Sequence, residues 1–172
     1  SDPRRAVRQK AAWLLAAVAD SLPTAALRAA FAAASGEFIA SQRYNADRAD
    51  HRVALGVFLL ARGDTVAALT EFTTAARQWP RHPDAILNLA GVLSLQGREA
   101  DGERALRDAL RTVPDDAEVH HALGLSLARQ SRLSEAIAEA EIAVRLAPGH
   151  AAFQRTLGAL RAARATPPAV AR

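Results

Sequence analysis

Five histidines are the residues of this chain that could most readily do chemistry: His51, His82, His120, His121 and His150. Imidazole nitrogens bind zinc and related metals, and two histidines four residues apart on a helix can hold one ion. His120 and His121 are adjacent instead, so on a helix their side chains point about 100° apart. The pattern therefore predicts no metal site. We expect His120 to pack between helices and His121 to lie on an accessible helix face.

Two neighbouring carboxylates, Asp115 and Asp116, resemble a catalytic acid pair only at first sight. They precede a helix-like segment, where aspartate caps free backbone N–H groups and complements the positive end of the helix dipole. Capping is the better interpretation, and Asp64 and Ser134 are candidates for the same role. The sequence also has no cysteine, no glycine-rich phosphate loop, no nucleophile elbow and no zinc-protease motif. It predicts neither an enzyme nor a bound cofactor.

The basic residues could bind phosphate groups, for example those of a nucleic acid. Lysine and arginine number 22 against 18 acidic residues, which gives a net charge of +4, and Lys10 is the one lysine. This small excess is weak evidence for a polyanionic partner. The arginine clusters near both ends of the chain also lack interleaved aromatic residues on which bases could stack. We expect solvated surfaces there and no nucleic-acid partner.

The composition indicates which elements position these residues. About one residue in four is alanine, the best helix former, and only 5% are aromatic, so the chain is expected to be all-α. No apolar run reaches the roughly 18 residues of a membrane span, so we expect no membrane insertion. Methionine is absent, which indicates that Ser1 is not a native start and that the chain is a piece of a longer protein.

Three prolines, Pro80, Pro114 and Pro148, reveal an internal repeat, because they are spaced 34 residues apart. Leucines and small residues recur at the same interval: Leu55-Gly56, Leu89-Ala90 and Leu123-Gly124, then Ala68, Gly102 and Ala136, then Ala75, Ala109 and Ala143. The turn residues Gly63, Gly97 and Ser131 keep the same register. We therefore divide the chain into units 49–82, 83–116 and 117–150, each predicted to be a helix, a tight turn and a second helix.

These units resemble the tetratricopeptide repeat, and the third unit matches that pattern best. The departures from the pattern are His120 and Arg52 where an aromatic residue is common, Gly102 in an alanine position, and Ser131 in the turn. The resemblance implies a right-handed α-solenoid, in which each short helix pair buries its apolar stripe only when a neighbour stacks on it.

The flanking segments are also expected to be helical. Residues 1–48 are predicted to form an N-terminal helical pair, with helices over 3–20 and 24–46. The first of these helices resembles a HEAT-type repeat through Asp2, Pro3, Val7, Arg8, Ala11, Ala12 and Leu15. Residues 151–165 restart the first-helix pattern and are predicted to be a capping helix, followed by a flexible tail over 166–172.

The order of these segments carries a second resemblance. A HEAT-like helix followed by Asn45-Ala46-Asp47-Arg48, His51 and Leu55-Gly56 is similar to the C-terminal region of some bacterial multihaem c-type cytochromes. That resemblance implies a periplasmic setting, with the haem-binding part upstream, because this chain contains no CxxCH motif. Without it, a cytoplasmic location is expected.

The tetratricopeptide resemblance also implies a concave groove that is lined by the first helix of each unit. The groove residues carried over from the family's pattern are Asp50, Val53, Val57, Leu60, Asp84, Leu87, Asn88, Ser94, Glu118, His121, Leu125, Arg129 and Arg155. This set has an apolar floor and an acidic edge, which favours a peptide or protein segment with apolar side chains. Only Asn88 and Arg129 suit the clamp with which some members of the family hold a peptide carboxylate, so we expect no such clamp.

Two alternatives to a peptide groove stay open at this point. Neighbouring helices could instead cover the apolar stripe. A second copy of the chain could also cover it, in which case the chain would self-associate. The function predicted first is a non-catalytic scaffold for protein–protein interaction. The alternative is a structural or docking tail of a larger exported redox protein, such as a multihaem cytochrome.

Overall fold

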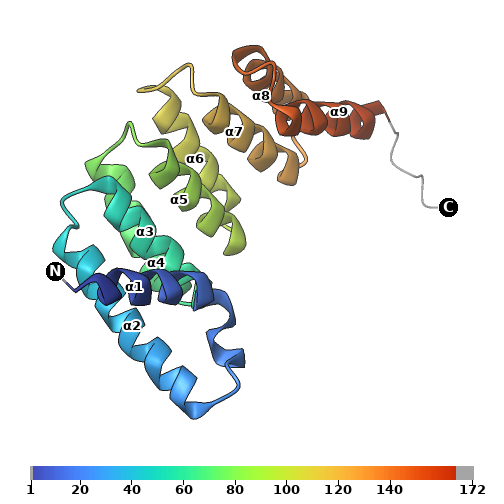
Figure 1. Ribbon diagram of the computed structural model, residues 1–172. Coiled ribbons are helices and arrows are strands. Elements are labelled where there is room, and N and C mark those ends of the chain that lie inside the picture. Colours follow the sequence, from blue (N-terminus) through green and yellow to red (C-terminus); the bar gives the residue numbers. More distant parts are fainter. Residues whose placement is uncertain (1, 166–172) are drawn as a thin grey trace. The chain divides into compact units, whose positions relative to one another are not determined.

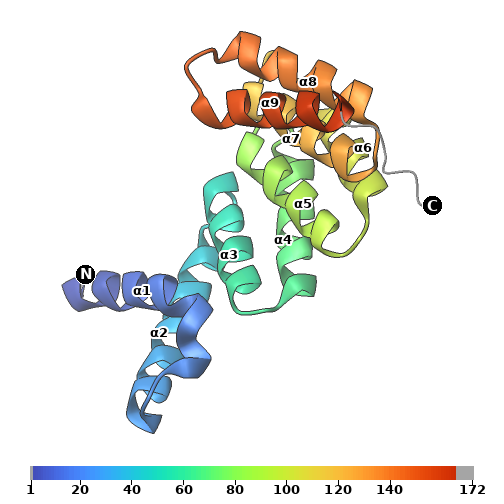
Figure 2. The same ribbon diagram turned by 90° about the vertical axis from the view of Figure 1, so that its right-hand side faces the viewer.

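Helices joined by short turns make up residues 2–165, which are the residues that the computed structural model describes (Figure 1). The all-α prediction is confirmed over this range. The predicted tail, 166–172, lies outside the described residues. The helices divide between two compact units, one up to Trp79 and one from Pro80 onward. Within each unit, helices that follow one another in the chain pack side by side (Figures 1 and 2).

The N-terminal unit contains four α-helices and one 3₁₀ segment: α1 (Pro3–Leu15), η1 (Ala16–Ser21), α2 (Ala25–Tyr44), α3 (Ala49–Ala61) and α4 (Thr65–Gln78). The helix predicted over 3–20 is thus α-helical only to Leu15 and then tightens into η1. Tightening leaves carbonyl groups without their α-helical partners. One of them is satisfied from outside, because the Arg62 guanidinium donates to the Ala16 carbonyl over 3.2 Å.

The core of this unit combines alanines with a chain of aromatic rings. Ala12, Ala16, Ala34, Phe38 and Phe58 form one buried cluster. The Phe38 ring centroid lies 4.9 Å from that of Phe58, in a tilted arrangement that favours aromatic pairs. Alanine on α1 and α2 leaves room for the rings, so few bulky residues suffice to join α1, α2 and α3.

The C-terminal unit contains five further helices: α5 (Pro83–Leu95), α6 (Glu99–Leu110), α7 (Ala117–Arg129), α8 (Leu133–Leu146) and α9 (Ala151–Ala165). The predicted caps Asp64 and Asp116 are confirmed: each carboxylate accepts backbone N–H groups at the start of α4 and α7. The prediction for Ser134 is wrong, because Arg132 occupies the cap position of α8. Ser131 has a left-handed φ of 61°, like the turn glycines Gly63 and Gly97, and this turn starts the helix before Ser134 is reached.

The departures at Arg52 and His120 have a structural explanation. The Arg52 guanidinium donates to Glu71 over 2.9 Å, and the His120 Nδ1 lies 2.6 Å from a Glu139 carboxylate oxygen. Both pairs join the first and second helices of a single repeat at equivalent positions, 68 residues apart in the chain. His120 is only 8% exposed, which confirms that it packs between helices.

Candidate functional site

The predicted groove residues lie on α3 in the N-terminal unit and on α5, α7 and α9 in the C-terminal unit. None of them is buried within its unit. Those that are exposed are Asp50, Asp84, Glu118, Arg129 and Arg155, whereas Val53, Val57, Leu60, Leu87, Asn88, Ser94, His121 and Leu125 are half-buried. In each unit taken by itself, the first helices therefore present part of the predicted apolar stripe, with charged residues beside it.

Two of the predicted acidic residues meet in the C-terminal unit. Asp84 and Glu118 line one hollow of about 450 Å³, in which Phe153 forms part of the apolar wall. Asp115 and Asp116 lie at the same hollow, because the starts of α5, α7 and α9 converge there. The acidic edge of the stripe is thus concentrated at the first turns of these helices.

Arg129, one of the two basic residues in the predicted set, is already engaged inside the molecule. Arg129 donates its Nε to a Glu99 carboxylate oxygen over 2.6 Å, and the hydroxyls of Ser94 and Ser126 donate to the same carboxylate. Burial raises the pKa of the Glu99 carboxyl, but these hydrogen bonds outweigh it and hold the pKa below its ordinary value. Glu99 is therefore a charged partner of Arg129.

The second residue suited to a carboxylate clamp is engaged as well. The Asn88 side-chain amide donates to the Asp84 backbone carbonyl, one turn earlier, over 2.7 Å. A peptide carboxylate would have to displace both this bond and the Arg129–Glu99 pair. Sequence reasoning missed Glu99, whose only signal was an acidic residue at a place where the third unit has Leu133.

His121 faces α9 on the stripe, while His120 points into its own repeat. The Nε2 of His121 lies 2.9 Å from the Thr156 hydroxyl, and its ring centroid is 4.6 Å from that of Phe153. Burial, aided by the nearby His150, lowers the pKa of His121. Across residues 2–165 no three histidines or carboxylates are grouped to hold a metal ion. None of the described helices has the length and apolar character needed to cross a membrane.

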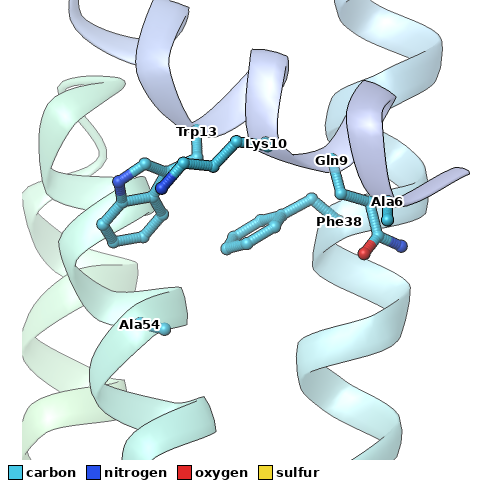
Figure 3. Close-up of a pocket in the computed structure, with 6 residues that line it drawn as sticks. All are labelled: Ala6, Gln9, Lys10, Trp13, Phe38 and Ala54. Carbon is cyan, nitrogen blue, oxygen red and sulfur yellow. The ribbon is translucent and has the colours of Figure 1, made fainter. Parts of the chain in front are cut away.

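The N-terminal unit contains a hollow that sequence reasoning did not predict. It has a volume of about 360 Å³ and is lined by Ala6, Gln9, Lys10, Trp13, Phe38 and Ala54 (Figure 3). The four α1 residues follow the spacing i, i+3, i+4, i+7 and so share one helix face. Trp13 packs with its ring centroid 5.6 Å from that of Phe38, and it also forms a wall of this hollow.

Comparison with known proteins supports the predicted repeat over part of the chain. The model of the tetratricopeptide repeat family matches residues 59–125, and no curated protein matches the chain. Among solved structures, the first tetratricopeptide domain of Spaghetti (RPAP3), bound to the HSP90 peptide SRMEEVD, is 18% identical with a TM-score of 0.63. That match covers 70% of this chain and 96% of the other.

Two further structures have the same fold. MamA from Desulfovibrio magneticus RS-1 is 20% identical, with a TM-score of 0.62 and coverage of 91% of this chain and 85% of that one. The Sgt2 tetratricopeptide domain from Aspergillus fumigatus is 22% identical, with a TM-score of 0.61 and coverage of 72% and 87%. At these identities the likeness concerns the fold.

Proposed function

We propose that this chain, whose residues 59–125 match the model of the tetratricopeptide repeat family, is a non-catalytic scaffold that holds a peptide or protein segment on the stripe along its first helices. The observation that carries the proposal is the exposure of the apolar stripe. Val53, Val57 and Leu60 on α3, Leu87 on α5 and Leu125 on α7 all stay partly accessible. A contiguous patch of accessible apolar side chains is typical of an interaction surface.

The comparison with Spaghetti (RPAP3) supports the class of partner. That protein's tetratricopeptide domain is bound to a peptide of HSP90, which is a precedent for a peptide ligand on this fold. The internal bonds of Asn88 and Arg129 argue against a carboxylate clamp in this chain. We therefore propose recognition through apolar side chains of the partner, with the acidic hollow at Asp84 and Glu118 beside them.

A pulldown from lysate of the source cells tests the stripe directly. We predict that Val57→Arg combined with Leu125→Arg abolishes capture of the partner that the wild-type chain retains, while helical content by circular dichroism is unchanged. Ala138→Arg is the matched control, because Ala138 is an exposed residue on a second helix. Partner capture by the double variant at the wild-type level would place the binding surface elsewhere.

The alternative function, a docking tail of a larger exported redox protein, stays a prediction, as does the periplasmic location that it implies. Several CxxCH motifs in the sequence that precedes Ser1 would support it. Self-association through the stripe also stays a prediction, and sedimentation equilibrium of the wild-type chain and of Leu125→Arg would test it.

A further inference from the structure

The floor of the hollow beneath α1 is held rigid by the core of the N-terminal unit. Phe38 is 7% exposed and belongs, with Phe58, to the buried cluster, and the Trp13 ring rests against it. Since these rings are already fixed, little side-chain entropy is lost when a ligand enters, and that raises affinity. The volume of about 360 Å³ lies near the lower end of the range for ligand pockets, about 300–1,000 Å³. It suits one or two apolar side chains.

The rim of the hollow is polar, and its two ends differ. Lys10 extends toward the indole of Trp13, whereas Gln9 lies beside Ala6 at the other end (Figure 3). Gln9 is fixed in place because its amide donates to the Glu37 backbone carbonyl over 3.2 Å. A side chain that entered over Phe38 would therefore carry its backbone past an ammonium group.

The charges around the hollow favour an acidic partner. Arg8 binds both carboxylates that could neutralise α1, donating to Glu37 at 2.9 Å and to Asp2 at 3.2 Å. Lys10 and Arg5 form no ion pair with any of residues 2–165, and Arg5 lies one turn before Gln9. An unneutralised lysine on the rim of an aromatic hollow, with Arg5 further along the same helix, repels a basic segment and attracts an acidic one.

We propose that this hollow, lined by Trp13, Phe38 and Ala54, is the anchor site for a partner segment in which a large apolar side chain is flanked by aspartate or glutamate. The apolar side chain lies on Phe38 against the Trp13 indole, and the flanking carboxylate pairs with Lys10. A partly buried tryptophan in the wall of a preformed hollow is typical of residues that dominate binding energy. The proposal rests on the proposed function, because it assumes that the partner is a protein segment.

Selection from a displayed library of random heptapeptides tests it, with the full chain as bait. The wild-type chain is expected to enrich peptides that have leucine, isoleucine, methionine or phenylalanine next to an acidic residue. Lys10→Glu reverses the charge at an exposed position, so we expect it to enrich lysine or arginine at the flanking position instead. A role of Lys10 in folding alone would not reverse this preference.

A synthetic peptide of the selected sequence, blocked at both ends, then gives the affinity. In a Trp79→Phe background Trp13 is the only tryptophan, so its emission reports binding at the hollow. We expect the Kd to rise about tenfold in Lys10→Glu, and binding to be lost in Ala54→Leu, which fills the hollow. Trp79→Phe alone is the matched control and should retain the wild-type Kd by fluorescence anisotropy.

Other outcomes would overturn the proposal. These are enrichment without acidic residues, the same peptides and Kd with Lys10→Glu, or tighter binding of a single-stranded oligonucleotide than of any peptide. If Leu125→Arg abolishes binding of the selected peptides while Lys10→Glu leaves it unchanged, the proposed function stands and the hollow is not the anchor site. If the wild-type chain enriches no peptide, both proposals fail.

Discussion

Repeats 2 and 3, residues 83–116 and 117–150, place the same small residues in opposite order. In repeat 3 the glycine is on the first helix, where a Cβ on Gly124 would lie 3.1 Å from the Ala136 carbonyl oxygen. In repeat 2 the first helix carries Ala90, and Gly102 on the second helix faces it. Each crossing thus contains one glycine and one alanine. The close approach of the two helices requires a glycine facing an alanine, but either helix can carry the glycine.

The two repeats also differ in how they meet the next helix. At equivalent places, repeat 2 has Glu103, which is 5% exposed, and repeat 3 has Ile137, which is 3% exposed. The Glu103 carboxylate accepts from Gln130 at 2.7 Å and from Arg132 at 2.7 Å and 2.8 Å. Repeat 2 is therefore joined to repeat 3 through a buried acid. This arrangement fixes the geometry of the junction, but it depends on every partner being present.

Removing the buried acid is expected to have the largest effect. Glu103→Ala leaves Gln130 with only a long bond to the Ser126 carbonyl, at 3.4 Å. Arg107 and Arg132 keep only Glu135, which they contact near the surface. Loss of hydrogen bonds to a charged, buried group predicts a decrease of about 2–3 kcal/mol in the free energy of unfolding. Urea denaturation followed by circular dichroism measures it, from the midpoint at an unchanged m-value.

Glu135→Ala is the matched control for Glu103→Ala. It removes the other carboxylate that pairs with Arg132, but Glu135 is exposed, and water replaces its contacts. We expect a clearly smaller shift of the urea midpoint. Equal shifts of the urea midpoint for the two variants would mean that the burial of Glu103 adds nothing to the stability of the junction between repeats 2 and 3.

An exchange of glycine for alanine at the two crossings is expected to have the next largest effect, with opposite signs. Gly124→Ala presses a methyl group on the Ala136 carbonyl, and we predict a loss of about 1 kcal/mol. In Gly102→Ala the nearest atom is the Ala90 carbonyl oxygen at 3.4 Å, an ordinary contact. There the higher helix propensity of alanine predicts a gain of up to about 1 kcal/mol. Thermal unfolding of both variants measures the difference, and a shift of Tm in the same direction for both would contradict the compensation between paired positions.

The repeat architecture could be predicted from the sequence because it depends on local and periodic signals. Each signal reflects one constraint on the backbone and can be read from the type and position of residues in the sequence. These signals are the spacing of 34 residues, the turn glycine and the small residues at fixed places. The compensation of Ala90 by Gly102 is different, because it involves two residues of two helices. Examined singly, Gly102 was a departure from the pattern.

The charged pairs and the hollow could not be predicted for a related reason. Glu71 and Glu139 lie 68 residues apart, as do their partners Arg52 and His120, so the recurrence was available as a signal. Which residues pair still depends on how two helices pack. The hollow at Trp13 depends on three helices at once, α1, α2 and α3, and on the small volume of Ala54. The stripe on the first helices stays a prediction as a binding site.

The smallest expected effect concerns the equivalent residues Leu87 of repeat 2 and His121 of repeat 3, because only the histidine can titrate. In the folded chain the pKa of His121 lies below the ordinary histidine value of about 6.5, owing to burial and to His150. As the pH falls below about 6.5, the unfolded chain takes up a proton that the folded chain resists, so stability decreases. His121→Leu, which copies repeat 2, should flatten the dependence of the urea midpoint on pH between 7.5 and 5.5.

The range excludes Glu99, whose lowered pKa makes its contribution to stability fall off only at more acidic pH. A slope that is unchanged by His121→Leu would show that the contact of His121 with α9 does not set the response to acid.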